Sequence, residues 1–360
     1  MKMHNCTPEK EQVLVFSIKD REYEYLLKEM ICLVENLFAE VVVTVTMNKN
    51  QLNPYTYIGK GKIEEIKGTL AEFNVKLVVV NDNLTPSQKR ELEEAFNVKV
   101  LDRTEIILEI FASRASTREA KLQVEVASYE YLKPRLTRMW SHLSRQQGGV
   151  GVRGIGEKQI ETDKRIIKKK IQKLKEELEE VKKNRSLQRK KRINSNEVSV
   201  ALVGYTNAGK SSLFNYFKGK TVFAKDQLFA TLDTVTKRVE VANTQFYLVD
   251  TVGFITNLPH FLVDSFKATL EEVLLSDILI NVIDAADENN YMQAVAVEQI
   301  LKELGINDKA IIKVYNKCDL LPKKLEVKDG LVISVKTGEN MDELINAIKY
   351  QIDLIGKKHV

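Results

Sequence analysis

Residues 204–211 read GYTNAGKS, which matches the phosphate-binding loop pattern G-x-x-x-x-G-K-[ST]. The flanking residues support the match, because 197–203 predict a buried strand and 211–217 predict the helix that should follow. In such a loop the backbone N–H groups surround the α- and β-phosphates, while the lysine reaches the β- and γ-phosphates. The expected nucleotide contacts are Gly204, Tyr205, Thr206, Asn207, Ala208, Gly209, Lys210 and Ser211, with the Ser211 hydroxyl on Mg²⁺.

Two later segments predict which base the nucleotide carries. An N-K-x-D element follows the apolar run 310–315, and the Asp319 carboxylate in it can accept two hydrogen bonds from the N1–H and N2–H₂ groups of guanine. Adenine has no such donor pair, so this geometry rejects ATP. Backbone N–H groups after the short strand 331–333 are placed to meet guanine O6. The expected contacts are Asn316, Lys317, Cys318, Asp319, Ser334, Val335 and Lys336.

The remaining elements of a nucleotide switch lie between the phosphate loop and the N-K-x-D element. A D-x-x-G element, Asp250, Thr251, Val252 and Gly253, follows the apolar run 244–249. We expect Asp250 to hold Mg²⁺ through water and the Gly253 N–H to sense the γ-phosphate. Upstream, Phe229, Ala230, Thr231, Leu232 and Asp233 stand where a first switch loop belongs. Thr231 is the predicted second Mg²⁺ hydroxyl, with Thr234 as the alternative.

Phe254 occupies the position after D-x-x-G where Ras-like GTPases place the glutamine that orients the attacking water. A phenyl ring cannot hydrogen-bond water, so hydrolysis should be slow without a partner, a cation or backbone groups. Alternatively, Phe254 packs away from the site and another residue serves. Asn207 supports a further hypothesis, a K⁺ ion bound beside the phosphates; the alternative is that Asn207 only closes the loop.

Composition limits the remaining function classes. A chain of 360 residues has room for two or three domains. No apolar run approaches 18 residues, so no membrane span is expected. The first residues lack the apolar core of a signal peptide, and Cys6, Cys32 and Cys318 show no paired or metal-ligand spacing. We therefore expect a cytoplasmic protein with reduced thiols and with no zinc site.

The chain divides into three predicted parts: a small α/β domain at 1–115, a long antiparallel helical hairpin at 116–193, and a G domain with a mostly parallel sheet at 194–360. In the first part strands are expected at 13–18, 41–46, 76–80 and 98–102, with helices at 23–37 and 86–96. The segment G-K-G-K at 59–62 precedes a helix. It is either a second anion site or a glycine turn.

The hairpin is predicted from apolar residues at steps of three and four, which is typical of a coiled-coil seam. A break at 145–156 with five glycines forms its tip, and Pro134 is expected to kink the first helix. The tip is either a flexible linker or an RNA-contacting loop, and its arginines and glutamines favour the second. The seam positions are Leu122, Val126, Tyr129, Leu132, Leu136, Trp140 and Leu143, then Ile167, Ile171, Leu174, Leu178 and Val181.

Charge is concentrated in the second arm of the hairpin. Residues 164–192 carry 14 Lys/Arg and 4 Glu, whereas the whole chain has a net charge of only +5. A charge run is usually a solvated face, but an excess of one sign favours a nucleic-acid contact through phosphates. The predicted RNA contacts are Arg145, Arg153, Lys164 and Arg165.

With these motifs in hand, the chain resembles the HflX family of GTPases. The resemblance includes NPYTYIGKGKIEEI (53–66), GGVGVRGIGEKQIETDKR (148–165) and the G-domain segments GYTNAGKS, FATLD, DTVGF and NKCD. It implies a cytoplasmic, ribosome-associated GTPase that binds the large ribosomal subunit and its RNA, is stimulated by the ribosome, and separates or rescues ribosomes under stress. Thr234-Val235 departs from the Pro-Thr expected after FATLD.

Two other functions remain open at this stage. One is an RNA-binding, GTP-dependent switch whose output is a recruited RNA or protein partner. The other is a GTPase subunit in tRNA modification, against which the lack of a terminal cysteine counts. In every case the expected ligands are GTP, GDP and Mg²⁺, and we expect a monomer.

Overall fold

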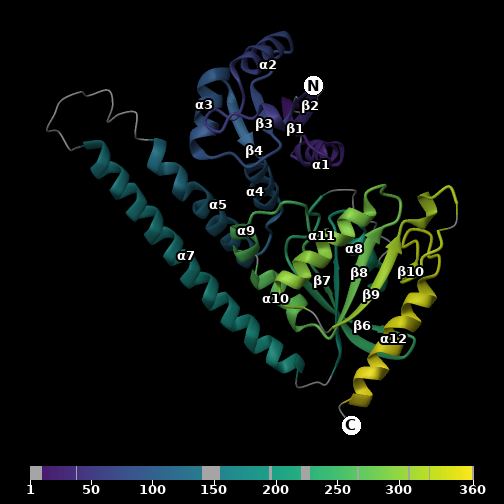
Figure 1. The fold of residues 1–360 in the computed structure, drawn as a ribbon. Coiled ribbons are helices and arrows are strands. Elements are labelled where there is room, and N and C mark those ends of the chain that lie inside the picture. The colour runs from purple at the N-terminus through teal and green to yellow at the C-terminus, as the bar shows by residue number, and fades with distance from the viewer. Residues whose placement is uncertain are drawn as a thin grey trace, which may run out of the picture. The chain divides into compact units, whose positions relative to one another are not determined.

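The computed structural model describes residues 10–37, 39–139, 155–193, 197–219, 228–265, 267–306, 309–323 and 325–358. The chain forms two compact units, one of Met1–Ser113 with Glu125–Lys173 and the other of Arg114–Val124 with Leu174–Val360 (Figure 1). Among the described residues, no helix combines the length and apolar character that crossing a membrane requires.

A four-stranded parallel sheet of order β2-β1-β3-β4 forms the centre of the first unit. Its inner strands are apolar along their whole length, as in β3 (LVVV), because parallel strands are covered on both faces. The strands are β1 (Glu11–Lys19), β2 (Ala39–Asn48), β3 (Leu77–Val80) and β4 (Lys99–Asp102). The helices are α1 (Tyr23–Glu35), η1 (Lys49–Gln51), α2 (Lys60–Glu72), α3 (Pro86–Phe96) and α4 (Arg103–Arg114).

Two long helices, α5 (Arg118–Met139) and α7 (Ile155–Ile193), form an antiparallel pair. Two ion pairs show that the helices run in opposite directions. Arg118 Nη2 lies 3.6 Å from Glu177 Oε2, whereas Glu125 Oε1, further along α5, lies 3.1 Å from Lys170 Nζ, which is earlier in α7. The fold class predicted from the sequence is thereby confirmed in this region. Helix α7 extends beyond the predicted seam because its last turns, although polar, contain neither glycine nor proline.

The predicted seam of the hairpin is correct in part. Five of its positions are buried, namely Leu122, Val126, Ile171, Leu174 and Leu178. Leu132 was predicted in the seam but is 41% exposed, and Tyr131 is buried in its place because its hydroxyl donates to the buried carboxylate of Asp102. Helix α5 also continues through Pro134 to Met139. The predicted tip, with Arg145 and Arg153, lies outside the described residues.

The second unit contains a six-stranded sheet of order β10-β9-β8-β5-β7-β6, in which only the edge strand β6 is antiparallel. This mostly parallel sheet is the predicted one. The strands are β5 (Ser199–Gly204), β6 (Val235–Val241), β7 (Thr244–Asp250), β8 (Ile278–Asp284), β9 (Ala310–Asn316) and β10 (Leu331–Val332). The helices are α8 (Lys210–Phe217), α9 (His260–Ser265), α10 (Lys267–Leu275), α11 (Asn290–Glu303), η2 (Cys318–Leu320) and α12 (Met341–Lys358).

Packing of apolar residues on this sheet determines where a ligand fits. Residues Val200, Leu202, Ile280, Val282 and Val314 are almost fully buried beneath helices such as α8 and α12. The parallel strands β5, β7, β8 and β9 therefore end together at one edge, where the polar loops that follow them converge. Open α/β sheets bind ligands at this edge.

Candidate nucleotide-binding site

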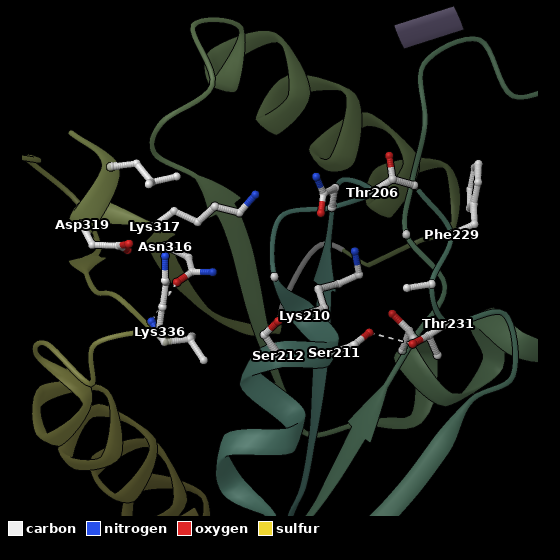
Figure 2. Close-up of a pocket in the computed structure, with 17 residues that line it drawn as sticks. Thr206, Lys210, Ser211, Ser212, Phe229, Thr231, Asn316, Lys317, Asp319 and Lys336 are labelled. Carbon is white, nitrogen blue, oxygen red and sulfur yellow. Dashed lines mark hydrogen bonds between the residues drawn. The ribbon is translucent and has the colours of Figure 1, made fainter. Parts of the chain in front are cut away.

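A cavity of about 660 Å³ opens at the carboxyl ends of β5, β7 and β9. The size suits a drug-sized or nucleotide-sized ligand. Figure 2 shows its lining side chains, which come from segments far apart in the sequence. The lining residues are Thr206, Asn207, Gly209, Lys210, Ser211, Ser212, Phe229, Ala230, Thr231, Thr251, Gly253, Asn316, Lys317, Asp319, Leu320, Val335 and Lys336.

The remaining residues predicted to contact the nucleotide do not line the cavity. They are Gly204, Tyr205, Ala208, Leu232, Asp233, Asp250, Val252, Cys318 and Ser334. Conversely, Ser212 and Leu320 line the cavity but were not among the predicted contacts. Ser212 directly follows the phosphate-loop motif and Leu320 directly follows the N-K-x-D motif, so their positions in the sequence could have predicted both as lining residues.

Two glycines give the phosphate loop its path. Gly204 has φ +146°, and a Cβ there would lie 2.2 Å from the Val282 carbonyl oxygen. Gly209 has φ +99°, and its Cβ would lie 2.2 Å from Nδ2 of Asn316. Any other residue would be strained and would collide with β8 or with the base-side loop, so the motif's end glycines are steric requirements here.

Lys210 begins helix α8 and is buried. Its Nζ donates to the carbonyl oxygens of Gly204 at 3.0 Å and Tyr205 at 2.6 Å. Burial lowers the pKa of Lys210 to about 8, against the opposing attraction of the Asp250 carboxylate. A lysine ammonium at the N-terminus of a helix, inside the loop, is well placed to bind phosphate oxygens.

Three oxygen-bearing side chains meet beside the lysine. The Ser211 and Thr231 hydroxyl oxygens lie 2.6 Å apart (Figure 2). Thr231 also donates to Oδ2 of Asp250 at 2.9 Å. The other Asp250 oxygen, Oδ1, is buried and has no hydrogen-bond partner in the described part of the chain. Burial raises the pKa of Asp250, although Lys210 and the two hydroxyls oppose the shift.

The D-x-x-G segment packs directly on the phosphate loop. The Phe254 N–H donates to Gly204 O at 3.1 Å, and Phe254 O accepts from the Thr206 N–H at 2.9 Å. A Cβ on Gly253 would lie 2.8 Å from Thr206 Cα, so the backbone approach requires glycine. The Phe254 side chain is 3% exposed and does not line the cavity. This geometry favours the interpretation that Phe254 packs away from the site.

Hydrogen bonds fix the opposite end of the cavity. Asn316 donates from Nδ2 to Ala208 O at 3.0 Å, and its Oδ1 accepts from the Val335 N–H at 3.1 Å, so it joins three loops. Ser334 Oγ donates to Asp319 Oδ1 at 2.6 Å. The Lys317 Nζ lies 2.7 Å from Asp284 Oδ2, a partner that the motif alone did not reveal.

The other predicted contacts do not line this cavity. Lys164 and Arg165 are exposed on α7, as a surface contact to RNA requires. At the G-K-G-K segment, Gly59 precedes α2 and Lys62 pairs with Glu65 at 2.7 Å. The described residues contain no group of three or more His, Cys, Asp or Glu side chains suited to hold a metal.

A phosphate loop, a D-x-x-G segment and an N-K-x-D segment around one cavity define a P-loop GTPase. Residues 24–112 match a family model described as GTP-binding GTPase N-terminal, residues 114–192 match the GTP-binding GTPase Middle Region, and residues 199–317 match a model described as 50S ribosome-binding GTPase.

Relatives extend over almost the whole chain. It is 46% identical to GTPase HflX of Lacrimispora saccharolytica, with 90% of this chain and 78% of the relative covered. It is 41% identical to GTPase HflX of Escherichia coli, with 93% and 81% covered. The chain therefore belongs to the HflX family of GTPases. A crystal structure of a GTP-binding protein from Sulfolobus solfataricus in complex with GDP superposes with a TM-score of 0.50 at 26% identity, covering 96% of this chain and 99% of that one.

Proposed function

We propose that the protein binds the large ribosomal subunit in the cytoplasm and hydrolyses GTP when the ribosome stimulates it, in order to split or rescue ribosomes under stress. The observation that supports this most is the cavity formed by the phosphate-loop, D-x-x-G and N-K-x-D segments, most of whose lining residues lie within 199–317, the segment that matches the 50S ribosome-binding GTPase model. The exposed basic residues of α7 provide a surface for ribosomal RNA. We expect a monomer to carry out this function.

In this proposal, guanine binds between the N-K-x-D segment and the loop after β10. Asp319 accepts hydrogen bonds from the guanine N1–H and N2–H₂ groups, and backbone N–H groups at Val335 and Lys336 meet O6. Lys317 packs its stem on the base, held by Asp284.

The phosphates bind in the loop between Gly204 and Ser211, where Lys210 contacts the β- and γ-phosphates. The cluster of Ser211, Thr231 and Asp250 oxygens suits Mg²⁺, which prefers oxygen ligands, and the unpartnered Asp250 Oδ1 gives that cluster a free acceptor. Bound there, Mg²⁺ would neutralise charge that develops on the phosphates. Thr231 is the better candidate than Thr234, since only Thr231 lines the cavity.

Hydrolysis requires a group that orients water, and the buried Phe254 ring does not supply one. The Gly253 backbone N–H and Lys210 stabilise the γ-phosphate in this proposal, while the ribosome completes the site. A K⁺ ion at Asn207, which lines the cavity with φ +61°, would also add positive charge there. Equal hydrolysis rates in KCl and NaCl would exclude that ion.

Binding to the ribosome can be tested separately from catalysis. The double variant Arg145→Ala/Arg153→Ala and the charge reversal Lys164→Glu/Arg165→Glu should each weaken cosedimentation with large subunits in the presence of a GTP analogue. Affinity for the analogue alone should stay at the wild-type value, because Lys164 and Arg165 lie outside the cavity. Unchanged cosedimentation of both variants would remove the hairpin from the proposed interface.

A further inference from the structure

Asp233 ends the first switch segment, yet its carboxylate is occupied outside the cavity. Oδ2 accepts hydrogen bonds from the Ser116 N–H at 3.1 Å, the Ser116 hydroxyl at 2.5 Å and the Thr117 N–H at 3.2 Å. The Thr117 hydroxyl donates to Oδ1. One carboxylate therefore receives four donors from two consecutive residues that lie more than a hundred positions away in the sequence.

Ser116 and Thr117 directly precede helix α5, and Thr117 is bonded to its first turn. Thr117 Oγ1 accepts from the Ala120 N–H at 3.1 Å, as an N-cap residue does, and Thr117 O accepts from the Lys121 N–H at 3.1 Å. Residues 114–124 belong to the same compact unit as the G domain. Asp233 is thus attached to the first turn of a 22-residue helix.

The attachment lies very close to the predicted Mg²⁺ ligand. Thr231 is only two residues upstream, so the chain can span at most about 7 Å between their Cα atoms. Leu232 between them is 2% exposed and adds a buried apolar contact. With Asp233 fixed, the Thr231 hydroxyl has little freedom to leave Ser211 and Asp250, with which it is hydrogen-bonded in this structure.

We propose that Asp233 is a positioning residue, whose hydrogen bonds to Ser116 and Thr117 hold the first switch segment so that Thr231 stays at the phosphate end of the cavity. This inference rests on the proposed nucleotide site and extends it, because it makes the start of the hairpin part of the GTP-binding machinery.

A matched set of variants in the full chain tests this role. Asp233→Ala removes the acceptor, and Ser116→Ala removes one donor without touching the α5 cap. Thr117→Ser keeps both hydroxyl hydrogen bonds and should behave as wild type. Ser113→Ala is the control, because Ser113 Oγ donates only to Ile110 O at 2.8 Å among the hydrogen bonds described.

The measurements are the Mg²⁺ concentration for half-maximal binding of a non-hydrolysable GTP analogue, the affinity for GDP without Mg²⁺, and the melting temperature. Asp233→Ala should raise the Mg²⁺ requirement about tenfold and Ser116→Ala about threefold, since hydrogen bonds to a charged group are lost. GDP affinity without Mg²⁺ should change less than about twofold, because that complex does not use Thr231 in this account.

Each contrary result has a separate meaning. A Mg²⁺ requirement that stays within twofold of wild type in both variants would overturn the positioning role. An equal loss of Mg²⁺-free GDP binding would also overturn it, because Asp233 would then act on the whole fold. A wild-type protein that binds no guanine nucleotide would instead refute the proposed function on which the inference rests.

Discussion

The two ends of the cavity differ in how completely their polar groups are paired. At the base end, Asn316 uses both ends of its amide within the protein, Ser334 donates to Asp319, and Lys317 pairs with Asp284. At the phosphate end, Asp250 Oδ1 and Thr206 Oγ1 are buried with no partner in the described part of the chain. Figure 2 shows Asn316, Lys317 and Asp319 on one side of the cavity and Thr206 on the other.

This difference suits two separate functions, base recognition at one end of the cavity and phosphate binding at the other. Buried polar atoms normally find hydrogen-bond partners, and at this end of the cavity a bound nucleotide and Mg²⁺ would supply them. In the proposed function, the base end selects guanine through groups that are already paired with one another. The phosphate end would gain its partners when phosphates and Mg²⁺ bind, which is how a switch couples its loops to the γ-phosphate.

The largest effect should follow from removing the cation at the phosphate end. Lys210→Ala should lower GTP affinity or turnover by more than about 100-fold, since a buried charge-assisted contact to phosphate is lost. Filter binding and single-turnover hydrolysis measure this. Lys218→Ala is a matched control, because Lys218 lies just after the same helix and stacks on Phe214. Unchanged hydrolysis by Lys210→Ala would refute the site.

A loss of similar kind is expected at the base end, but it should be specific to the base. Asp319→Asn should weaken GTP binding about 100-fold and bring xanthine nucleotides to comparable or better affinity, because the amide presents a donor where guanine needs an acceptor. Competition between GDP and XDP measures the change. Retained preference for guanine would contradict the assignment of Asp319 as the base-reading residue.

A smaller effect should come from pH at the phosphate end. Lys210 has a pKa of about 8 in the free protein, and bound phosphates favour its charged form. Affinity for GDP should therefore be highest below pH 8 and fall as the pH rises through that value, by about fourfold between pH 7 and 8.5. Calorimetry at pH 8 in two buffers of different ionisation enthalpy should detect proton uptake. Equal apparent enthalpies in both buffers would contradict the shift.

The smallest effect should come from the ion pair that holds Lys317. Asp284→Asn removes the charge from a partly exposed pair and should weaken GDP and GTP binding about threefold, with no change in Mg²⁺ dependence. Asp287→Asn is the control, because the Asp287 carboxylate bonds to Asn289 and Gln293 instead. A change in Mg²⁺ dependence with Asp284→Asn would show that the two ends are not independent.

Much of the fold and most of the cavity could be predicted because their signals are local. The phosphate loop, D-x-x-G and N-K-x-D segments each depend on the backbone path of a few consecutive residues, and the apolar runs of β1, β3, β5 and β9 mark buried parallel strands. The structure then shows that these segments meet at one edge of the sheet.

Contacts between distant segments could not be predicted in this way. Asp233 finds Ser116 and Thr117, Lys317 finds Asp284, and Tyr131 turns inward to Asp102 although Leu132 fits the apolar periodicity better. Each contact depends on how packed elements bring polar groups together, and periodicity along one helix carries no information about that.

The most direct test of the account is GTP hydrolysis by the purified full chain, alone and with added large ribosomal subunits, at saturating Mg²⁺. We expect slow hydrolysis alone and a rise of more than about tenfold with subunits, because the buried Phe254 leaves the water without an orienting side chain. An equal rate with and without subunits would contradict ribosome stimulation and favour a switch that acts on another RNA or protein.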